Sequence, residues 1–361
     1  MAKASEAYVR AGEREVRISS PDRVIYEATD RTPAVTKLMV AEYFTSVEDG
    51  LMRALRDRPT ALERWTSGVR PGMKLATGPQ DRNADAFYQK RVPKGAPDYL
   101  QTATITFPSG RTADEICPTE IAVPVWCAHM GTLTFHPWPV RRDDVDHPDE
   151  LRIDLDPQPG TTFTDAVRVA GVARELLDDH GMTGFAKTSG NRGIHVYVRI
   201  EPKWDFAAVR HAAIAFGREL EKRDDGVTTA WWKEERGERI FVDFNQNTRD
   251  RTIASAYSLR PIPGAPVSTP VTWDELAGLT SAADFNLFTV PDRIAADGDP
   301  WAAIDDVHCS LEAPLALWEE HPVELNFPPD HPKMPGEPPR VQPSKKVEAH
   351  WDEDGNRVEG T

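Results

Sequence analysis

Hydrophobic residues recur at helical spacing in three segments of the chain. Between positions 36 and 55 they lie three or four residues apart, and Thr36 precedes them as a plausible helix cap. The segment 206–223 has the same period. A third helix is predicted over about 165–180, with Thr164 as its cap and Gly181 after its end. The pattern therefore predicts amphipathic helices at 36–55, 165–180 and 206–223.

Other segments alternate in the manner of strands. LRIDLDP at 151–157 alternates apolar and polar residues with a period of two. Shorter apolar runs predict strands at 185–187, 194–200 and 240–244, and a short strand followed by a turn within residues 1–33. The run 121–138 is apolar enough to be buried. Mixed helices and strands in this order predict an α+β fold.

Two aspartates on the predicted strand share one face. Asp154 and Asp156 lie two residues apart, so their carboxylates point to the same side of the sheet. Carboxylates held this close favour a divalent cation between them, and oxygen ligands suit Mg²⁺ or Mn²⁺. Asp243, after the apolar strand IFV, is a candidate third ligand. The alternatives are an ion pair with Arg152 on that face and a simple strand-end turn at Asp243.

A loop rich in glycine, serine and basic residues separates two predicted strands. It reads KTSGNRGIHVY at 187–197, and its glycines permit positive φ angles and close backbone approach to an anion. The side chains that can donate to phosphate oxygens are those of Lys187, Ser189, Arg192 and His195. A structural glycine-rich hairpin with a buried histidine is the equally open alternative.

Three further features suit a nucleotide or nucleic acid. Arg260, in the segment TIASAYSLR, could clamp a triphosphate, although a surface arginine is the default. His136, in FHPW, is by itself more often structural than a ligand. The stretch 58–99 interleaves basic and aromatic residues, a pattern that can follow a phosphate backbone and stack on bases, or that can simply be a solvated loop.

Composition limits the choice of class. The 361 residues carry a formal net charge of −15, so a DNA-binding surface would need a local basic groove on an acidic body. Three separated cysteines favour neither a zinc site nor a disulfide scaffold and fit a reducing cytoplasm. The N-terminus lacks the apolar core of a signal peptide, and no apolar run of about 18 residues predicts a membrane span. From about residue 322, repeated prolines predict an extended or disordered tail.

The order of five motifs in this chain resembles that in the polymerase domain of bacterial ligase D. The motifs are FHPW, LRIDLDP, KTSGNRGIHVY, FVDFNQN and TIASAYSLR. That domain is a branch of the archaeo-eukaryotic primase superfamily. The chain looks most like the stand-alone actinobacterial members, which lack the ligase. Similar stretches run from roughly residue 15 to 318, and RPTALERWTSG with DAFYQKRVPKGAPDYL also fits. Each motif is weak alone, but the ordered set is specific.

The resemblance implies an α+β primase-polymerase fold with an RRM-like antiparallel catalytic sheet flanked by helices. It implies one polymerase domain over residues 1–320, with template-contacting segments in 1–120 and a catalytic part in 121–320, followed by the proline-rich tail 321–361. No KxDG motif of a ligase is present, so we expect the polymerase module alone, as a monomer in the cytoplasm at the nucleoid. Ku and a separate ligase are possible partners.

The implied activity is DNA-dependent addition of NTPs or dNTPs to 3′ ends or gaps during DNA repair, by two Mn²⁺ or Mg²⁺ ions. Carried over by position, the metal ligands are Asp154, Asp156 and Asp243. The nucleotide contacts are His136, Lys187, Ser189, Arg192, His195 and Arg260. The DNA or template contacts are Arg64, Trp65, Phe87, Tyr88 and Lys90.

Two positions depart from the pattern of relatives. Glu63 stands where many of them carry lysine, which weakens any expectation of a phosphate contact there. Gln246 stands where some of them use arginine. Two other functions remain open: a two-metal nuclease, which needs the acids but no triphosphate clamp, and a non-catalytic module that binds DNA ends. Primer-dependent extension and true priming are likewise not separated by the sequence.

Overall fold

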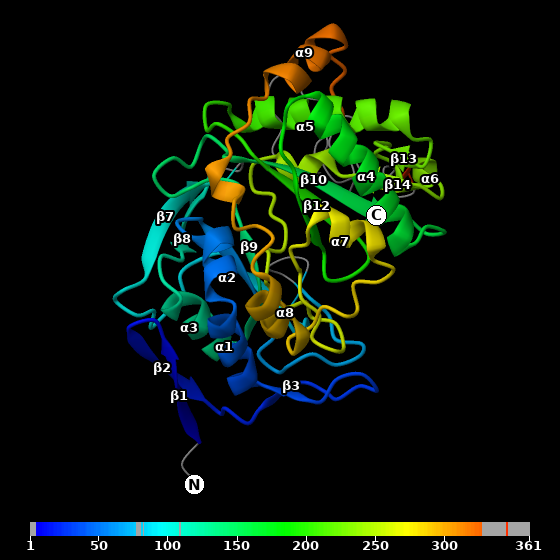
Figure 1. Ribbon diagram of the computed structural model, residues 1–361. Helices are drawn as coiled ribbons and strands as arrows, with labels where there is room; N and C mark the ends of the chain where they lie inside the picture. Colours follow the sequence, from blue (N-terminus) through cyan, green and yellow to red (C-terminus); the bar gives the residue numbers. More distant parts are fainter. Residues whose placement is uncertain (1–4, 77–80, 82, 108–109, 327–343, 346–361) are drawn as a thin grey trace, which may run out of the picture.

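A five-stranded sheet crosses the upper half of the molecule and carries the predicted acidic strand (Figure 1). The computed structural model describes residues 5–76, 81, 83–107, 110–326 and 344–345. We call the sheet with the acidic strand the second sheet, because its strands come later in the chain than those of the sheet described below. They lie in the order β11 (Phe185–Thr188), β12 (Ile194–Arg199), β10 (Glu150–Pro157), β14 (Ile240–Val242) and β13 (Val227–Thr228). All neighbours are antiparallel except β13 and β14, which run parallel.

The alternation along β10 divides its side chains between two faces. Leu151, Ile153 and Leu155 are buried in the core, where β10 packs against two helices, α4 (Phe163–Asp179) and α5 (Phe206–Arg223). The polar residues of the strand, among them Asp154 and Asp156, therefore point to the opposite face. This arrangement confirms the strand that the sequence predicts.

The helix α4 begins earlier than the sequence predicts, and Thr164 is not its cap. Thr162 occupies the cap position: its hydroxyl accepts from the Asp165 N–H, and the Asp165 carboxylate accepts in return from the Thr162 N–H at 2.8 Å. This reciprocal capping box satisfies two otherwise unpaired donors, which Thr164 inside the first turn cannot do. The helix α5 matches its predicted range and is capped by Asp205.

A first sheet lies below the second and is built around β5 (Thr60–Arg64). Its other strands are β6 (Phe87–Gln89), β7 (Gln101–Thr106), β8 (Thr112–Cys117) and β9 (Thr132–Pro137). β5 pairs antiparallel with β6, β8 and β9, which places Glu63 opposite Tyr88 on one side and opposite Thr134 on the other. The apolar run 121–138 is buried as predicted, as the helix α3 (Ala122–His129) and the strand β9.

The single helix expected over 36–55 is two helices. α1 (Lys37–Ser46) has the predicted Thr36 cap, and α2 (Glu48–Leu55) follows after a break at Val47. In the last turn of α1, the hydroxyls of Thr45 and Ser46 donate to backbone carbonyls three residues earlier, which competes with regular helix continuation.

The remaining helices and strands complete the structure around the two sheets. At the N-terminal end lie β1 (Glu6–Ala11), β2 (Arg14–Ser19), β3 (Val24–Tyr26) and β4 (Val35–Thr36), where a single short strand was expected. Beyond β13 lie α6 (Lys233–Arg236), η1 (Phe244–Asn247), α7 (Trp273–Gly278), α8 (Thr289–Asp297), η2 (Ile304–Asp306) and α9 (Glu312–Glu320). Phe244, expected in a strand, opens the 3₁₀ turn η1 instead, because Asp243 leaves the extended conformation and its carboxylate accepts from the Asn245 N–H.

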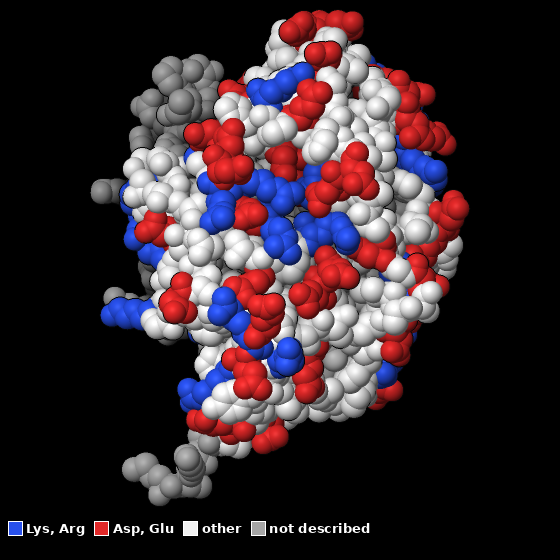
Figure 2. Space-filling model, turned by 60° about the vertical axis from the view of Figure 1, so that its left-hand side comes forward, with Lys and Arg blue, Asp and Glu red and all other residues white. Residues whose placement is uncertain are grey.

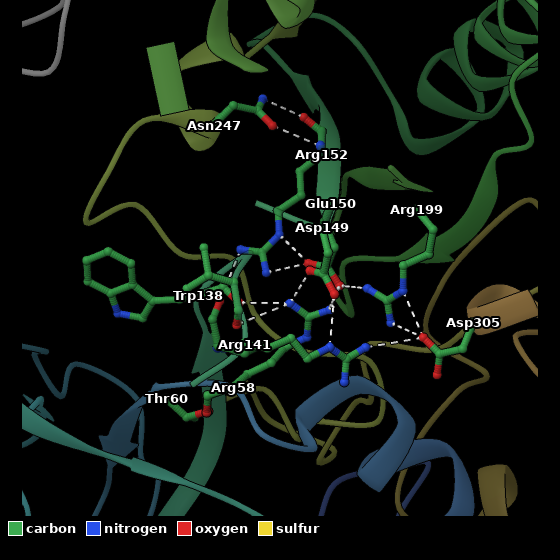
Figure 3. A network of polar contacts seen from close by, with 12 residues as sticks. Arg58, Thr60, Trp138, Arg141, Asp149, Glu150, Arg152, Arg199, Asn247 and Asp305 are labelled. Atoms are coloured by element: carbon green, nitrogen blue, oxygen red, sulfur yellow. Dashed lines mark hydrogen bonds and ion pairs between the residues drawn. The ribbon is translucent and has the colours of Figure 1, made fainter. Parts of the chain in front are cut away.

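A buried network of charged side chains joins the two sheets where β10 begins (Figure 3). Arg58, just before β5, is fully buried and donates to Asp149 at 2.6 and 2.8 Å. Its guanidinium also lies 3.0 Å from Glu150, which in turn binds Arg152 and Arg199. Each buried charge has a partner of opposite sign, which such burial requires. The network therefore fixes β10 relative to the first sheet.

The described chain continues in packed form beyond α9. The carboxylate of Glu324 binds Arg210 and His211 of α5, and the Asn245 side chain donates to the Asn326 carbonyl at 2.9 Å. The predicted disorder of the tail concerns mostly residues 327–343 and 346–361, which lie outside the described residues.

Charge is spread unevenly over the surface. On the face shown in Figure 2, lysine and arginine side chains gather near the middle and acidic side chains surround them. An acidic chain can therefore present a locally basic region. None of the described helices is long and apolar enough to cross a bilayer. The architecture, antiparallel sheets with flanking helices, confirms the predicted α+β class.

Candidate active site

Three aspartates meet on two neighbouring strands of the second sheet. Asp154 and Asp156 lie on β10, and Asp243 directly follows β14. The Asp243 N–H donates to the Asp154 carbonyl at 3.1 Å, which holds the two backbones together at this point. Burial, then Asp156 and Asp243, raise the pKa of Asp154 well above its usual range. Loss of surrounding water and the charge of Asp243 also raise the pKa of Asp156, even though that side chain is exposed.

The donor set fits a hard divalent cation, although the side chains do not yet converge on one point. Carboxylate oxygens are the preferred ligands of Mg²⁺ and Mn²⁺, and a cation between these groups would relieve the mutual repulsion that raises their pKa values. In the described residues no three His, Cys, Asp or Glu side chains are arranged as a formed metal cluster. Asp243 is instead turned to Gln246, whose amide donates to its Oδ2 at 3.0 Å. The other oxygen of Asp243 accepts from the Asn245 N–H, so both of its oxygens have partners within the chain.

Arg152 does not neutralise these aspartates. Its guanidinium donates to Glu150 at 2.6 Å and to the Pro137 carbonyl at 3.0 Å, inside the buried network of Figure 3. The ion pair considered from the sequence as an alternative to metal binding is therefore absent between Arg152 and the aspartates. Arg236 and Arg192 lie close enough to lower the pKa of Asp156, but burial and Asp243 outweigh them.

A row of three residues crosses the sheet next to the acids. Lys187 on β11 is opposite His195 on β12, and His195 is opposite Asp154 on β10. His195 Nε2 lies 3.4 Å from Asp154 Oδ1, and His195 Nδ1 lies 2.8 Å from Lys187 Nζ. Burial, followed by Lys187 and Arg260, holds the pKa of His195 well below its usual range, which favours the neutral imidazole.

The loop between β11 and β12 brings Ser189 and Arg260 to the same place. The Ser189 hydroxyl accepts from the N–H groups of Asn191 and Gly193, at 3.2 and 3.1 Å. This leaves its own hydrogen to donate. Gly190 has φ +73°, and a Cβ there would lie 2.5 Å from Cγ of Arg260. The conformation of the loop and the position of the Arg260 side chain therefore both depend on glycine at residue 190.

Arg260 is a cation without an ion-pair partner in the described structure. Its Nε is buried and has no hydrogen-bond partner among the described residues. Its backbone is held from both sides: the N–H donates to the Pro266 carbonyl, and the carbonyl accepts from the Tyr26 hydroxyl. A guanidinium with unused donors on a well-held backbone is suited to an incoming phosphate.

His136 is held by a residue that the sequence pattern left aside. The Glu63 carboxylate lies 2.9 Å from His136 Nε2 and also accepts from the Trp65 indole at 2.9 Å. Glu63 is only 3% exposed. Burial lowers the pKa of His136, and Glu63 opposes that effect. The rings of His136 and Tyr88 lie nearly perpendicular to each other, with centroids 5.1 Å apart.

The predicted DNA-contacting residues divide into exposed and buried ones. Phe87 and Tyr88 are large exposed aromatics at 39% and 44%. Arg64 stacks on Phe87, and Lys90 pairs with Asp250 at 2.5 Å. Trp65, expected to contact DNA or template, is only 5% exposed, and its indole donates to Glu63, so its ring has little surface for such a contact. Its hydrophobic ring belongs to the core.

Lys187 and Arg192 also lie differently from the expectation. Lys187 is fully buried behind His195, so it has no surface to offer a nucleotide. Arg192 is exposed, and its guanidinium donates to the carbonyls of Thr161 and Pro157 at 3.2 and 3.4 Å. Arg236 was missed, because a single arginine in a polar segment carries no periodic signal. Glu63 was noted only as a departure from the relatives, and its contact with His136 was not foreseen.

Comparisons with known proteins agree with this geometry. Residues 36–301 match the family described as LigD, primase-polymerase domain. The chain is 32% identical over 304 residues to the multifunctional non-homologous end joining protein LigD of Pseudomonas aeruginosa, covering 83% of this chain and 34% of that protein. The protein of the same description from Mycolicibacterium smegmatis is 30% identical, with 83% and 37% covered. The chain thus spans about a third of the length of these relatives.

A solved structure extends the match to three dimensions. The polymerase domain from Mycobacterium tuberculosis ligase D in complex with DNA aligns with a TM-score of 0.71 and 28% identity, over 82% of this chain and 100% of that one. The family match covers most of the chain, and the fold agrees over almost the same range. The chain therefore belongs to the LigD primase-polymerase domain family and is a primase-like nucleotidyltransferase.

Proposed function

We propose that this chain adds NTPs or dNTPs to the 3′ ends or gaps of DNA, with Asp154, Asp156 and Asp243 as the ligands of two Mn²⁺ or Mg²⁺ ions. The observation that carries the proposal is the meeting of three mutually repelling carboxylates with a buried neutral histidine and an unpaired arginine. The family is metal-dependent, and the oxygen donors found here suit either ion.

Bound divalent ions would stabilise the charge of the triphosphate and lower the pKa of the primer 3′-OH. The chain itself supplies the rigid frame for that chemistry. β10 and β14 fix the spacing of Asp154, Asp156 and Asp243 through their backbone hydrogen bonds. Gln246 donates to Asp243 Oδ2 and so orients that carboxylate.

Donors around the acids would bind the triphosphate. Ser189 has a free hydroxyl hydrogen, His195 directs Nε2 toward Asp154, and Arg260 has unused donors. His136 joins them from β9, with its charge tuned by Glu63. These donors would offset the negative charge that develops on the departing pyrophosphate. Arg192 is close to Asp156 and could exchange its two carbonyl contacts for phosphate contacts.

The exposed aromatic strand would hold DNA. Phe87 and Tyr88 offer ring faces on which a base can stack, and base–aromatic stacking is sequence-tolerant. Arg64, stacked on Phe87, and Lys90 would add positive charge for the phosphate backbone. The related polymerase domain is known in complex with DNA. Because Tyr88 of β6 contacts His136, this proposed DNA contact would lie beside the proposed nucleotide site.

We further propose that the chain works in end joining, as the names of its relatives indicate for those proteins. It matches the polymerase portion of them, and we propose a ligase and a Ku-like protein that bridges DNA ends as its partners. We expect a monomer that acts in the cytoplasm on nucleoid DNA.

The test is an extension assay with a 5′-labelled primer–template and Mn²⁺ or Mg²⁺. Parallel reactions with NTPs and dNTPs determine the sugar preference. The proposal predicts a lengthened primer. A shortened primer would indicate a two-metal nuclease, and retained DNA binding without any change in length would indicate a binding module. Either of those results would overturn the proposal.

A further inference from the structure

Lys187 is a buried cation placed directly behind the histidine of the site. It is 0% exposed and lies on β11, one strand further from the acids than His195. In the register of the sheet, Lys187, His195 and Asp154 form a continuous row. A side chain so enclosed acts on the nucleotide only through His195.

The hydrogen-bond directions in this row follow from the chemistry of its members. Lys187 Nζ lies 2.5 Å from the Ser268 hydroxyl oxygen, and that hydroxyl donates its only hydrogen to the Thr188 carbonyl at 3.0 Å. The Ser268 oxygen must therefore accept from Lys187. Burial, followed by the nearby Arg260, lowers the pKa of Lys187 well below its usual range, but Nζ carries at least two hydrogens whether the group is charged or neutral. With one hydrogen donated to Ser268, a second is available to His195 Nδ1 at 2.8 Å.

An accepting Nδ1 decides where the imidazole carries its proton. A neutral imidazole has one N–H, and if Nδ1 is the acceptor, the proton is on Nε2. Nε2 is the nitrogen that faces Asp154 at 3.4 Å.

We propose that Lys187 is a positioning residue that keeps the proton of His195 on Nε2, so that the ring presents a donor, never a lone pair, to the nucleotide. This inference rests on the proposed nucleotide site but not on its chemistry, because the tautomer exists before any ligand binds. It gives Lys187 a different role from the direct phosphate contact expected from the sequence.

The decisive measurement is made on the wild-type protein without metal or nucleotide. Long-range ¹H–¹⁵N spectra of protein labelled with ¹⁵N-histidine distinguish a protonated ring nitrogen from an unprotonated one, and a His195→Gln variant assigns the signal. We expect a protonated Nε2 and an unprotonated Nδ1. A proton on Nδ1 would overturn the proposal and would mean that Lys187 is neutral and accepts.

Variants then test the consequence. In Lys187→Met the tautomer is no longer fixed, and the dissociation constant for the nucleotide should rise by about tenfold or more, the usual cost of losing an outer-shell partner. Lys187→Arg keeps a donor and should restore much of that loss. DNA binding should not change. The matched control is Lys222→Met on the exposed end of α5. Unchanged nucleotide affinity in a folded Lys187→Met would contradict the proposal.

The two readouts separate this inference from the polymerase assignment. If the primer is extended but His195 carries its proton on Nδ1, the positioning role fails and the polymerase function stands. If Nε2 carries the proton but the primer is never extended, the function fails and the role of Lys187 in fixing the ring stands. If Lys187→Met does not fold, the wild-type spectrum still decides.

Discussion

Gly190 and Arg260 are packed so closely that the loop has no room for any other residue. A Cβ on Gly190 would lie 2.5 Å from Cγ of Arg260 and 3.0 Å from the Val267 backbone, and φ at Gly190 is +73°. The loop between β11 and β12 and the arginine from a distant segment thus form one unit. This contact links the glycine-rich motif to the proposed phosphate clamp.

In Gly190→Ala, the loss of binding free energy for the nucleotide should be much larger than the loss in the free energy of unfolding. The substitution displaces Arg260, whose guanidinium is proposed to hold the triphosphate, and it adds the cost of an L-residue at positive φ. The control is Gly181→Ala, which has φ +65° but nothing within 4 Å of the new Cβ. Equal losses of nucleotide affinity in the two variants would show that the Arg260 contact is unimportant.

Asp149→Asn should destabilise the fold strongly. It leaves the fully buried Arg58 with a single remaining carboxylate partner, Glu150, and breaking a buried ion pair costs about 3–5 kcal/mol. Chemical denaturation of the variant measures the change in the free energy of unfolding. The control is Asp144→Asn, which removes an exposed pair with His147 and should have little effect. A similar small effect at Asp149 would contradict the structural role of the network.

Glu115 predicts a pH dependence of stability. Burial raises its pKa from 4.5 to about 8, and one of its oxygens has no hydrogen-bond partner in the described structure. The folded protein binds this proton more tightly than the unfolded chain does. The stabilising free energy that Glu115 contributes is therefore complete below pH 4.5 and is lost as the pH rises to about 8. The slope is up to about 1.4 kcal/mol per pH unit.

Glu115→Gln should remove that slope, because the amide cannot ionise, and it should raise the free energy of unfolding at pH 8 relative to the wild type. Denaturation at pH 5 and pH 8 measures both values. The amide oxygen can still accept from Trp138, as the carboxylate does at 3.0 Å. A variant with the same pH dependence as the wild type would show that Glu115 is already ionised in the fold.

Glu63→Gln should lower the pKa of His136. The carboxylate raises that pKa against the effect of burial, and the amide keeps the shape without the charge. His136 would then lose its proton at a lower pH, so the affinity for a triphosphate should decline at mildly acidic pH. A pH titration of the His136 ring signal by NMR measures the shift. An unchanged or higher pKa would rule out the influence of Glu63.

Local patterns in the sequence predicted much of this fold. The helix α5 and the strand β10 appear at their predicted positions because amphipathic periods of 3.6 and 2 residues encode which face is buried. The cap of α4 was misplaced because Thr162 and Thr164 are both plausible caps, and only the return contact from Asp165 selects the first. The break at Val47 depends on side-chain hydroxyl contacts that the apolar period does not register.

The site was predictable in its residues but not in its contacts. Asp154 and Asp156 share a face because they are two residues apart, and spacing alone shows this. The contact of Lys187 with His195 depends on the register between β11 and β12, which no local spacing fixes. The burial of Trp65 and the pairing of Glu63 with His136 likewise arise from the packing of β5 between β6 and β9.

Asp154→Asn gives the most direct measurement of the proposed chemistry. Primer extension with Mn²⁺ and NTPs is compared between this variant and Asp178→Asn, which alters an exposed aspartate of α4. Losing a metal-ligand charge costs several kcal/mol of transition-state stabilisation, so extension should fall by roughly a thousandfold or more in Asp154→Asn. Asp178→Asn should match the wild type. Full extension by a folded Asp154→Asn protein would contradict the assignment of the three aspartates as the metal-binding catalytic centre.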